Sequence, residues 1–182
     1  MTTTLDQIPI QTIDGKSSKL GDYDGKVRLV VNVASKCGLT PQYAALESVY
    51  RKYRERGFEV LAFPANEFLA QEPGTNEEIK SFCSTSYDVT FPLFAKIVVK
   101  GEGIHPLYAE LTREVPQARA LPTSGYRAEL AGYGTRPGPG EVLWNFEKFL
   151  VDRSGKVVER FEPDVAPDAE MVTAAIERAL GA

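Results

Sequence analysis

Cys37 stands at a junction in the sequence where a thiol could react. It follows an apolar, β-branched run at 27–35 and precedes Gly38 and a predicted helix at 41–55. The first turn of a helix offers unpaired N–H groups and the positive end of a dipole, which stabilise a reactive thiolate. Lys36 adds positive charge, and Gly38 lets a ligand approach the backbone. These features favour a nucleophilic cysteine, whereas a small buried side chain is the common alternative.

The chain has two cysteines, Cys37 and Cys83, and one histidine. Its start lacks a basic region followed by an apolar one, and no apolar run is long enough to span a membrane. We therefore expect a cytoplasmic protein. In that reducing compartment, two cysteines favour free thiols or redox chemistry over a structural disulfide. The soft ligands are also too few for a typical zinc site.

The elements around Cys37 predict how it is held. Residues 27–35 read as a strand that is buried on both faces. The amphipathic helix at 41–55 has Thr40 as its expected N-cap and Pro41 at its first position. A second strand follows at 58–64. Strand, helix and strand in this order predict a parallel βαβ unit.

The other elements complete an α/β pattern. They are a hairpin at 8–20 with its turn at Asp14 and Gly15, a helix that begins at the capping box Thr75–Glu78 and carries Cys83, a strand at 91–99, a short helix within 101–116, a hairpin at 147–161 and a helix at 168–180. Residues 117–141 are rich in Gly and Pro, and we expect a mostly irregular surface insertion. The sum predicts one α/β domain of thioredoxin-like size over residues 1–182, with a mixed central sheet and helices on both faces.

The overall composition argues against nucleic-acid binding. The chain is 43% hydrophobic and 25% charged, as in an ordinary globular protein. Its net charge is −4 and its pI is about 5.2, so it lacks the basic footprint of a nucleic-acid binder.

Three blocks of the sequence resemble one known family. VNVASKCGLTPQY around Cys37, FPANEFLAQEPG at 63–74 and WNFEKFLVDRSG at 144–155 are similar, in this order, to blocks of the glutathione peroxidases in their cysteine form. The resemblance runs from about residue 10 to about residue 167. It implies a thioredoxin-like fold and a peroxidase that needs no metal or organic cofactor.

The resemblance implies a catalytic tetrad of Cys37, Gln71, Trp144 and Asn145. The residue types suit this role, because indole and amide N–H donors stabilise a thiolate and the oxygen that leaves a peroxide. Taken without the resemblance, Trp144 reads as a core residue, Gln71 as a solvated loop residue and Asn145 as a strand-end cap.

The resemblance also implies a role for the second thiol. In thioredoxin-dependent members, a resolving cysteine lies on the helix before a Phe-Pro pair, which is the position of Cys83. Cys37 would attack hydrogen peroxide or an organic hydroperoxide and become a sulfenic acid, Cys83 would form a disulfide with it, and thioredoxin would reduce that disulfide. Ala65 stands where many members have a further cysteine, so no redox role rests there.

Two other functions remain open from the sequence. The same peroxidase could be reduced by glutathione directly, with Cys83 as a buried bystander. Alternatively, Cys37 and Cys83 could form a redox sensor that passes oxidation to a protein partner with little turnover. In each case we expect a monomer or a weak homodimer.

Overall fold

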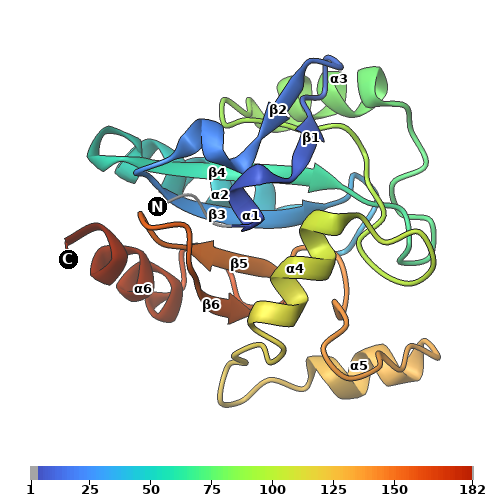
Figure 1. Cartoon of the computed structure of the whole chain (residues 1–182). Helices are drawn as coiled ribbons and strands as arrows, with labels where there is room; N and C mark the ends of the chain where they lie inside the picture. Colours follow the sequence, from blue (N-terminus) through green and yellow to red (C-terminus); the bar gives the residue numbers. More distant parts are fainter. Residues whose placement is uncertain (1–3, 182) are drawn as a thin grey trace.

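The computed structural model describes residues 4–181 (Figure 1). The predicted domain also includes residues 1–3 and 182, which lie outside the described part of the chain. The helices are α1 (Thr4–Gln7), η1 (Leu20–Tyr23), α2 (Gln42–Tyr53), η2 (Arg54–Arg56), α3 (Asn76–Tyr87), α4 (Pro106–Glu114), α5 (Tyr126–Gly132) and α6 (Glu170–Gly181), of which η1 and η2 are 3-10 helices. The strands are β1 (Pro9–Gln11), β2 (Ser17–Lys19), β3 (Val27–Val33), β4 (Phe58–Pro64), β5 (Lys148–Val151) and β6 (Val157–Phe161). Within residues 4–181, no helix has the length and apolar character needed to cross a membrane.

The central sheet has four strands in the order β4-β3-β5-β6. β3 and β4 run parallel, with Val27 opposite Phe58, and β5 pairs antiparallel with both β3 and β6. Every residue of β3 and β4 is buried. Strands covered on both faces need apolar residues at nearly every position, which explains the near-continuous apolar runs of their sequences. The predicted βαβ unit and the mixed sheet are confirmed.

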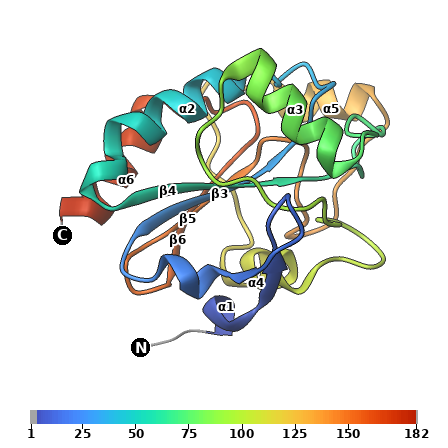
Figure 2. The same cartoon turned by 90° about the horizontal axis from the view of Figure 1, so that it is seen from above.

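Helices cover both faces of this sheet, as Figure 2 shows. α2 and α6 lie on one face, and α1 and α4 lie on the other. α3 and α5 lie toward the end of the sheet where β3 and β4 finish, at opposite sides of the molecule in Figure 1. That end is where α/β folds place their binding sites.

The prediction of a strand at 91–99 is wrong. This segment runs beside β4 but forms isolated bridges, one between Leu93 and Ala62 and one between Phe94 and Thr12. Pro92 accepts a hydrogen bond from the N–H of Ala62 at 3.2 Å but has no N–H to donate. A proline interrupts a ladder in this way, so the pairing does not extend into a regular strand.

Both predicted hairpins are confirmed. β1 and β2 pair antiparallel, and β5 and β6 do the same. Each hairpin turns at a glycine with positive φ, 84° at Gly15 and 87° at Gly155. Glycine adopts this left-handed conformation without steric cost, which is why a turn residue of this type marked each hairpin in the sequence.

The insertion at 117–141 is more ordered than its composition indicates. It contains the seven-residue helix α5, which the sequence did not predict. Its first part runs along the end of β6, because the N–H of Arg119 donates to the carbonyl of Arg160 at 2.7 Å and the N–H of Glu162 donates to the carbonyl of Arg119 at 2.9 Å. These backbone bonds hold the insertion against the sheet.

Candidate active site

Cys37 lies in the turn that follows β3 and is almost buried, with 9% of its surface exposed. The backbone N–H of Leu39 donates to its sulfur at 3.3 Å. The N–H of Cys37 donates to the hydroxyl of Thr40 at 3.0 Å, and that hydroxyl donates to the carbonyl of Ala34 at 2.8 Å. The turn therefore aims one backbone donor at the thiol and fixes the backbone on either side of it.

The predicted helix start differs from the observed one. α2 begins at Gln42, and Pro41 occupies the N-cap position without a side-chain hydrogen bond. Thr40, the expected N-cap, uses its hydroxyl for the Cys37 turn instead. Cys37 thus precedes the helix by a run of turns, beginning with the bond from the N–H of Thr40 to the carbonyl of Cys37 at 3.0 Å. The donor next to the sulfur is a turn amide, not an N–H of the first helical turn.

Gln71 is carried to Cys37 by a constrained loop between β4 and α3. Leu69 and Ala70 have left-handed φ values of 54° and 50°, which residues other than glycine adopt at an energetic cost. The carbonyl of Gln71 accepts from the N–H of Lys36 at 3.0 Å, so the loop is tied to the residue next to the thiol. Strained backbone of this kind often marks a functional site.

Trp144 and Asn145 enter the site from the segment just before β5. The side-chain amide of Asn32, on β3, donates to the carbonyl of Trp144 at 3.1 Å, and the N–H of Phe146 donates to the carbonyl of Asn32 at 2.6 Å. The indole of Trp144 packs against the ring of Phe68, with ring centroids 5.3 Å apart. Asn32 therefore anchors both ends of the turn that presents Trp144 and Asn145.

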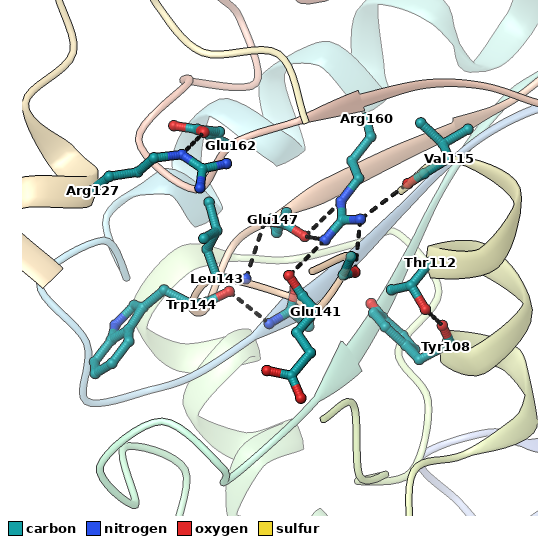
Figure 3. A network of polar contacts seen from close by, with 12 residues as sticks. Tyr108, Thr112, Val115, Arg127, Glu141, Leu143, Trp144, Glu147, Arg160 and Glu162 are labelled. Atoms are coloured by element: carbon teal, nitrogen blue, oxygen red, sulfur yellow. Dashed lines mark hydrogen bonds and ion pairs between the residues drawn. The ribbon is translucent and has the colours of Figure 1, made fainter. Parts of the chain in front are cut away.

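A buried ion pair fastens this segment to β6, as Figure 3 shows. The guanidinium of Arg160 contacts the carboxylate of Glu147 at 2.6 Å, and the side chains are 2% and 0% exposed. Arg160 also donates to the carbonyls of Val115, Gly140 and Glu141, each at 3.0 Å. Burial raises the pKa of Glu147, and the charge of Arg160 opposes that rise.

The same carboxyl holds the chain next to Trp144. Glu147 accepts from the N–H of Leu143 at 3.2 Å. The ion pair thus links β6, the end of the insertion and the residue before Trp144 in one network (Figure 3). A network whose buried members are all bonded restricts the position of the segment that it joins.

A pocket of about 290 Å³ opens at the thiol. Its walls are formed by Cys37, Gly38, Leu39, Leu69, Gln71, Tyr126, Glu129, Leu130, Tyr133 and Trp144. Three of the four predicted tetrad residues meet here. Asn145 is not part of the wall. It is fully buried behind Gln71, and its side-chain amide donates to the side-chain oxygen of Gln71 at 2.9 Å.

The sequence did not predict that the insertion contributes to this pocket. Three lining residues belong to α5, namely Tyr126, Glu129 and Leu130, and Tyr133 is the residue that caps its end. Their spacing of i, i+3, i+4 and i+7 is that of one helix face, which the sequence YRAELAGY contains. This helical pattern covers only eight residues within a Gly- and Pro-rich stretch, so the composition of the stretch predicted an irregular loop instead.

Cys83 lies on α3, as predicted, and both cysteines are free thiols. Cys83 is completely buried and does not line the Cys37 pocket. Burial raises the pKa of its thiol to about 11, and the neighbouring side chain of Tyr43, on α2, partly offsets this rise. The carboxyl of Glu72 adds a smaller upward contribution. In this conformation Cys83 is a protonated thiol shielded from solvent.

The sequence and fold match known proteins along most of the chain. Residues 5–112 match the family model described as glutathione peroxidase. The thioredoxin/glutathione peroxidase BtuE of Escherichia coli (strain K12) is 52% identical over 172 residues, which cover 94% of each chain. The hydroperoxy fatty acid reductase gpx1 of Synechocystis sp. is 47% identical over 168 residues, covering 92% of this chain and 90% of that protein.

Solved structures show the same architecture. The crystal structure of Trgpx in its apo form superimposes with a TM-score of 0.71 at 35% identity, over 98% of this chain and 97% of that one. The predicted thioredoxin-like fold, with its mixed sheet between helices, is confirmed.

Proposed function

The chain belongs to the glutathione peroxidase family of peroxidases, and we propose that Cys37 is the thiol at which it reduces hydroperoxides. The observation that carries this proposal is the pocket itself. The Cys37 thiol, the amide of Gln71 and the indole of Trp144 share one small pocket at the end of the parallel strands. The sequence resemblance, the geometry and the chemistry of these side chains support the same role.

The first step is an attack by the Cys37 thiolate on one oxygen of the peroxide. The O–O bond breaks, the sulfur becomes a sulfenic acid, and water or an alcohol leaves. The N–H of Leu39 contributes to thiolate stabilisation because it already donates to the sulfur. Gln71 uses its side-chain oxygen for the bond with Asn145, which leaves its two N–H donors for the peroxide.

The second step is resolution of the sulfenic acid by Cys83. The Cys83 sulfur attacks the Cys37 sulfur, the S–O bond breaks, water leaves, and the disulfide is then reduced by the two thiols of thioredoxin. A protein reductant fits the charge of the site. Among the described residues that line the pocket, the charged one is Glu129, and no lysine or arginine is present to bind the carboxylates of glutathione.

Direct reduction by glutathione is the second candidate. The complete burial of Cys83 favours it, because a bystander thiol would show the same environment. One relative carries both reductants in its name, thioredoxin/glutathione peroxidase. The two candidates differ in whether turnover needs Cys83.

We further propose a cytoplasmic protein that acts as a monomer or a weak homodimer. Free thiols at Cys37 and Cys83 are compatible with a reducing compartment. The pocket at Cys37 is lined by residues of one chain, so catalysis by a single copy is sufficient.

NADPH-coupled turnover tests these steps. The wild-type protein should consume peroxide with thioredoxin and its reductase faster than with glutathione and its reductase. Cys37→Ser should be inactive with either reductant, because a serine hydroxyl is a poor nucleophile at neutral pH. Activity of Cys37→Ser within a few-fold of wild type would overturn the proposal.

Cys83→Ser separates the two reductants. It should keep the first reaction of Cys37 with peroxide and lose turnover with thioredoxin. If it turns over normally with thioredoxin, Cys83 is a bystander and direct reduction is correct.

A further inference from the structure

The helix α5 forms one side of the Cys37 pocket. Tyr126, Glu129 and Leu130 of α5 line the pocket with Tyr133, which caps the helix, and with Leu39 and Leu69 from the loops beside the thiol. Leu130 is 3% exposed and packs into the protein, whereas Glu129 and Tyr133 are exposed. A peroxide bound in this pocket would therefore lie beside α5.

This wall is fixed in place. Arg127, on the outer side of α5, contacts the carboxylate of Glu162 at 2.6 Å, and the Glu162 side chain is 2% exposed. Ser124, just before α5, donates to the carboxylate of Asp164 at 2.6 Å. Its oxygen also accepts from the N–H of Tyr126 at 3.2 Å. These bonds hold α5 against the segment that follows β6, so α5 is a fixed part of the pocket wall.

The mouth of the pocket presents apolar surface to solvent. Leu69 and Tyr133 are each 62% exposed, and they are two of the three exposed large hydrophobic residues among residues 4–181. Leu69 is held out in a left-handed conformation, with φ at 54°. Exposure of an apolar side chain on strained backbone is costly, and contact with an apolar ligand is a function that offsets the cost.

The charge beside this apolar surface is negative. Glu129 is exposed and is the charged member of the pocket lining within the described residues. Burial raises the pKa of Tyr126, and the negative charges of a Cys37 thiolate and of Glu129 add to the rise.

The two lysines nearest in sequence or packing to the site, Lys36 and Lys100, do not line the Cys37 pocket. Lys36 lines a separate hollow that it shares with Glu72. Lys100 pairs with Glu141 at 3.8 Å and lies over the ring of Phe68, with 5.9 Å from its nitrogen to the ring centroid. A substrate carboxylate in the pocket would meet Glu129 without a partner cation from the pocket lining.

We propose that α5 makes this pocket select uncharged hydroperoxides with an apolar group, and that Glu129 is the specificity-determining residue that disfavours hydroperoxides with a carboxylate near the peroxide. The proposal rests on the proposed role of Cys37. Two like charges several ångströms apart near a protein surface should slow the reaction of the anionic substrate by about threefold to tenfold at low salt. Salt should reduce this factor because it screens exposed charges.

A matched set of substrates tests the charge selection. Cumene hydroperoxide with a para carboxylate and its methyl ester differ mainly in charge, and hydrogen peroxide needs no apolar contact. Trp144, the single tryptophan of the chain, lines the pocket and provides a fluorescence signal for the rate of Cys37 oxidation. In wild type the ester should react faster than the carboxylate. Glu129→Gln should bring the two rates close together when each is divided by the same variant's rate with hydrogen peroxide.

Control variants isolate the site. Glu177→Gln on α6, where Glu177 pairs with Arg56, makes the same change of charge away from the pocket and should keep the wild-type ratio. Tyr133→Ser should slow the ester several-fold relative to the same variant's rate with hydrogen peroxide. Equal rates for the ester and the carboxylate in wild type, or a ratio that Glu129→Gln does not change, would overturn the inference. Failure of Cys37 to react with any peroxide would instead overturn the proposed function.

Discussion

The side-chain amide of Asn145 donates a 2.9 Å hydrogen bond to the side-chain oxygen of Gln71. Through this bond, the segment before β5 meets the loop after β4. Asn145 is fully buried and outside the pocket lining, whereas Gln71 lines the pocket. The bond orients the amide of Gln71, so we propose that Asn145 is a positioning residue that acts through Gln71.

Substitutions in the donor group should slow the first step and should not be additive. Gln71→Ala, Trp144→Phe and Asn145→Ala each remove N–H donors but leave the Cys37 thiol in place. Loss of one donor in a preorganised site costs on the order of 3 kcal/mol, or about a hundredfold in rate. The double variant of Gln71 and Asn145 should lose little more than Gln71→Ala alone, because Asn145 works through Gln71. The measurement is the second-order rate of Cys37 oxidation by hydrogen peroxide, and wild-type rates in all three single variants would refute the assignment.

Breaking the buried ion pair should destabilise the protein more than removing both of its members. Arg160→Met leaves the carboxyl of Glu147 fully buried without its cation, along with three unpaired carbonyls. We expect a loss of about 3–5 kcal/mol in the free energy of unfolding. Adding Glu147→Gln should restore part of that loss. Urea unfolding of the single and double variants measures both terms, and strictly additive losses would contradict the expected coupling.

The buried amine of Lys148 should make stability rise with pH above neutrality. Burial lowers its pKa from 10.5 to about 7, which the charges of Glu147 and Asp164 only partly oppose. Between these two values the unfolded chain holds a proton that the folded protein has released, so the free energy of unfolding increases with pH. Cys83 acts in the opposite sense above pH 9, because its pKa rises from 9.0 to about 11 on folding.

Lys148→Met tests the pH dependence. Lys148 donates to the carbonyls of Pro163 and Val165 at 2.8 Å and 2.5 Å, so the variant should lose stability at every pH. Its free energy of unfolding should also lose the rise that wild type shows between about pH 7 and pH 9. The comparison needs urea unfolding curves at several pH values, and parallel pH profiles for the two proteins would argue against Lys148 as the titrating group.

Much of the fold could be predicted from the sequence because periodicity and turn chemistry are local signals. Continuous apolar runs predicted β3 and β4, and glycine turns predicted both hairpins. The segment at 91–99 was apolar for another reason. It packs between β4 and the hairpin of β1 and β2, which gives it the apolar composition of a buried strand. Pro92 nevertheless prevents a regular ladder of backbone hydrogen bonds.

The site was predictable only in part, for a related reason. Cys37, Gln71 and Trp144 lie far apart in the sequence, and the resemblance of three blocks to one family grouped them before the fold brought them to one pocket. No family block covers the α5 residues that line the pocket. Their segment has an irregular composition, and its contacts with Glu162 and Asp164 hold it in place. Likewise, Thr40 was predicted to be the helix N-cap. Its hydroxyl instead accepts a hydrogen bond from the N–H of Cys37, so it does not cap the helix.

The two thiols should meet only after α3 opens. A disulfide needs Cα atoms within about 7 Å of each other and side chains that face one another. Cys83 instead lies next to Tyr43 and does not line the Cys37 pocket. Its backbone carbonyl accepts a hydrogen bond from the N–H of Val89 at 3.2 Å. We therefore expect the end of α3 to unwind when the disulfide forms, which would also expose the disulfide to thioredoxin.

Hydrogen exchange before and after a stoichiometric dose of peroxide checks this last expectation. Exchange at residues 76–90 should rise on oxidation, and peptide mapping should find a Cys37–Cys83 link. The same treatment of Cys37→Ser provides the matched control, in which α3 keeps its protection because no sulfenic acid forms for Cys83 to attack. Formation of the link with no change in exchange along α3 would show that the helix reaches Cys37 intact, and unwinding would then have no part in the cycle.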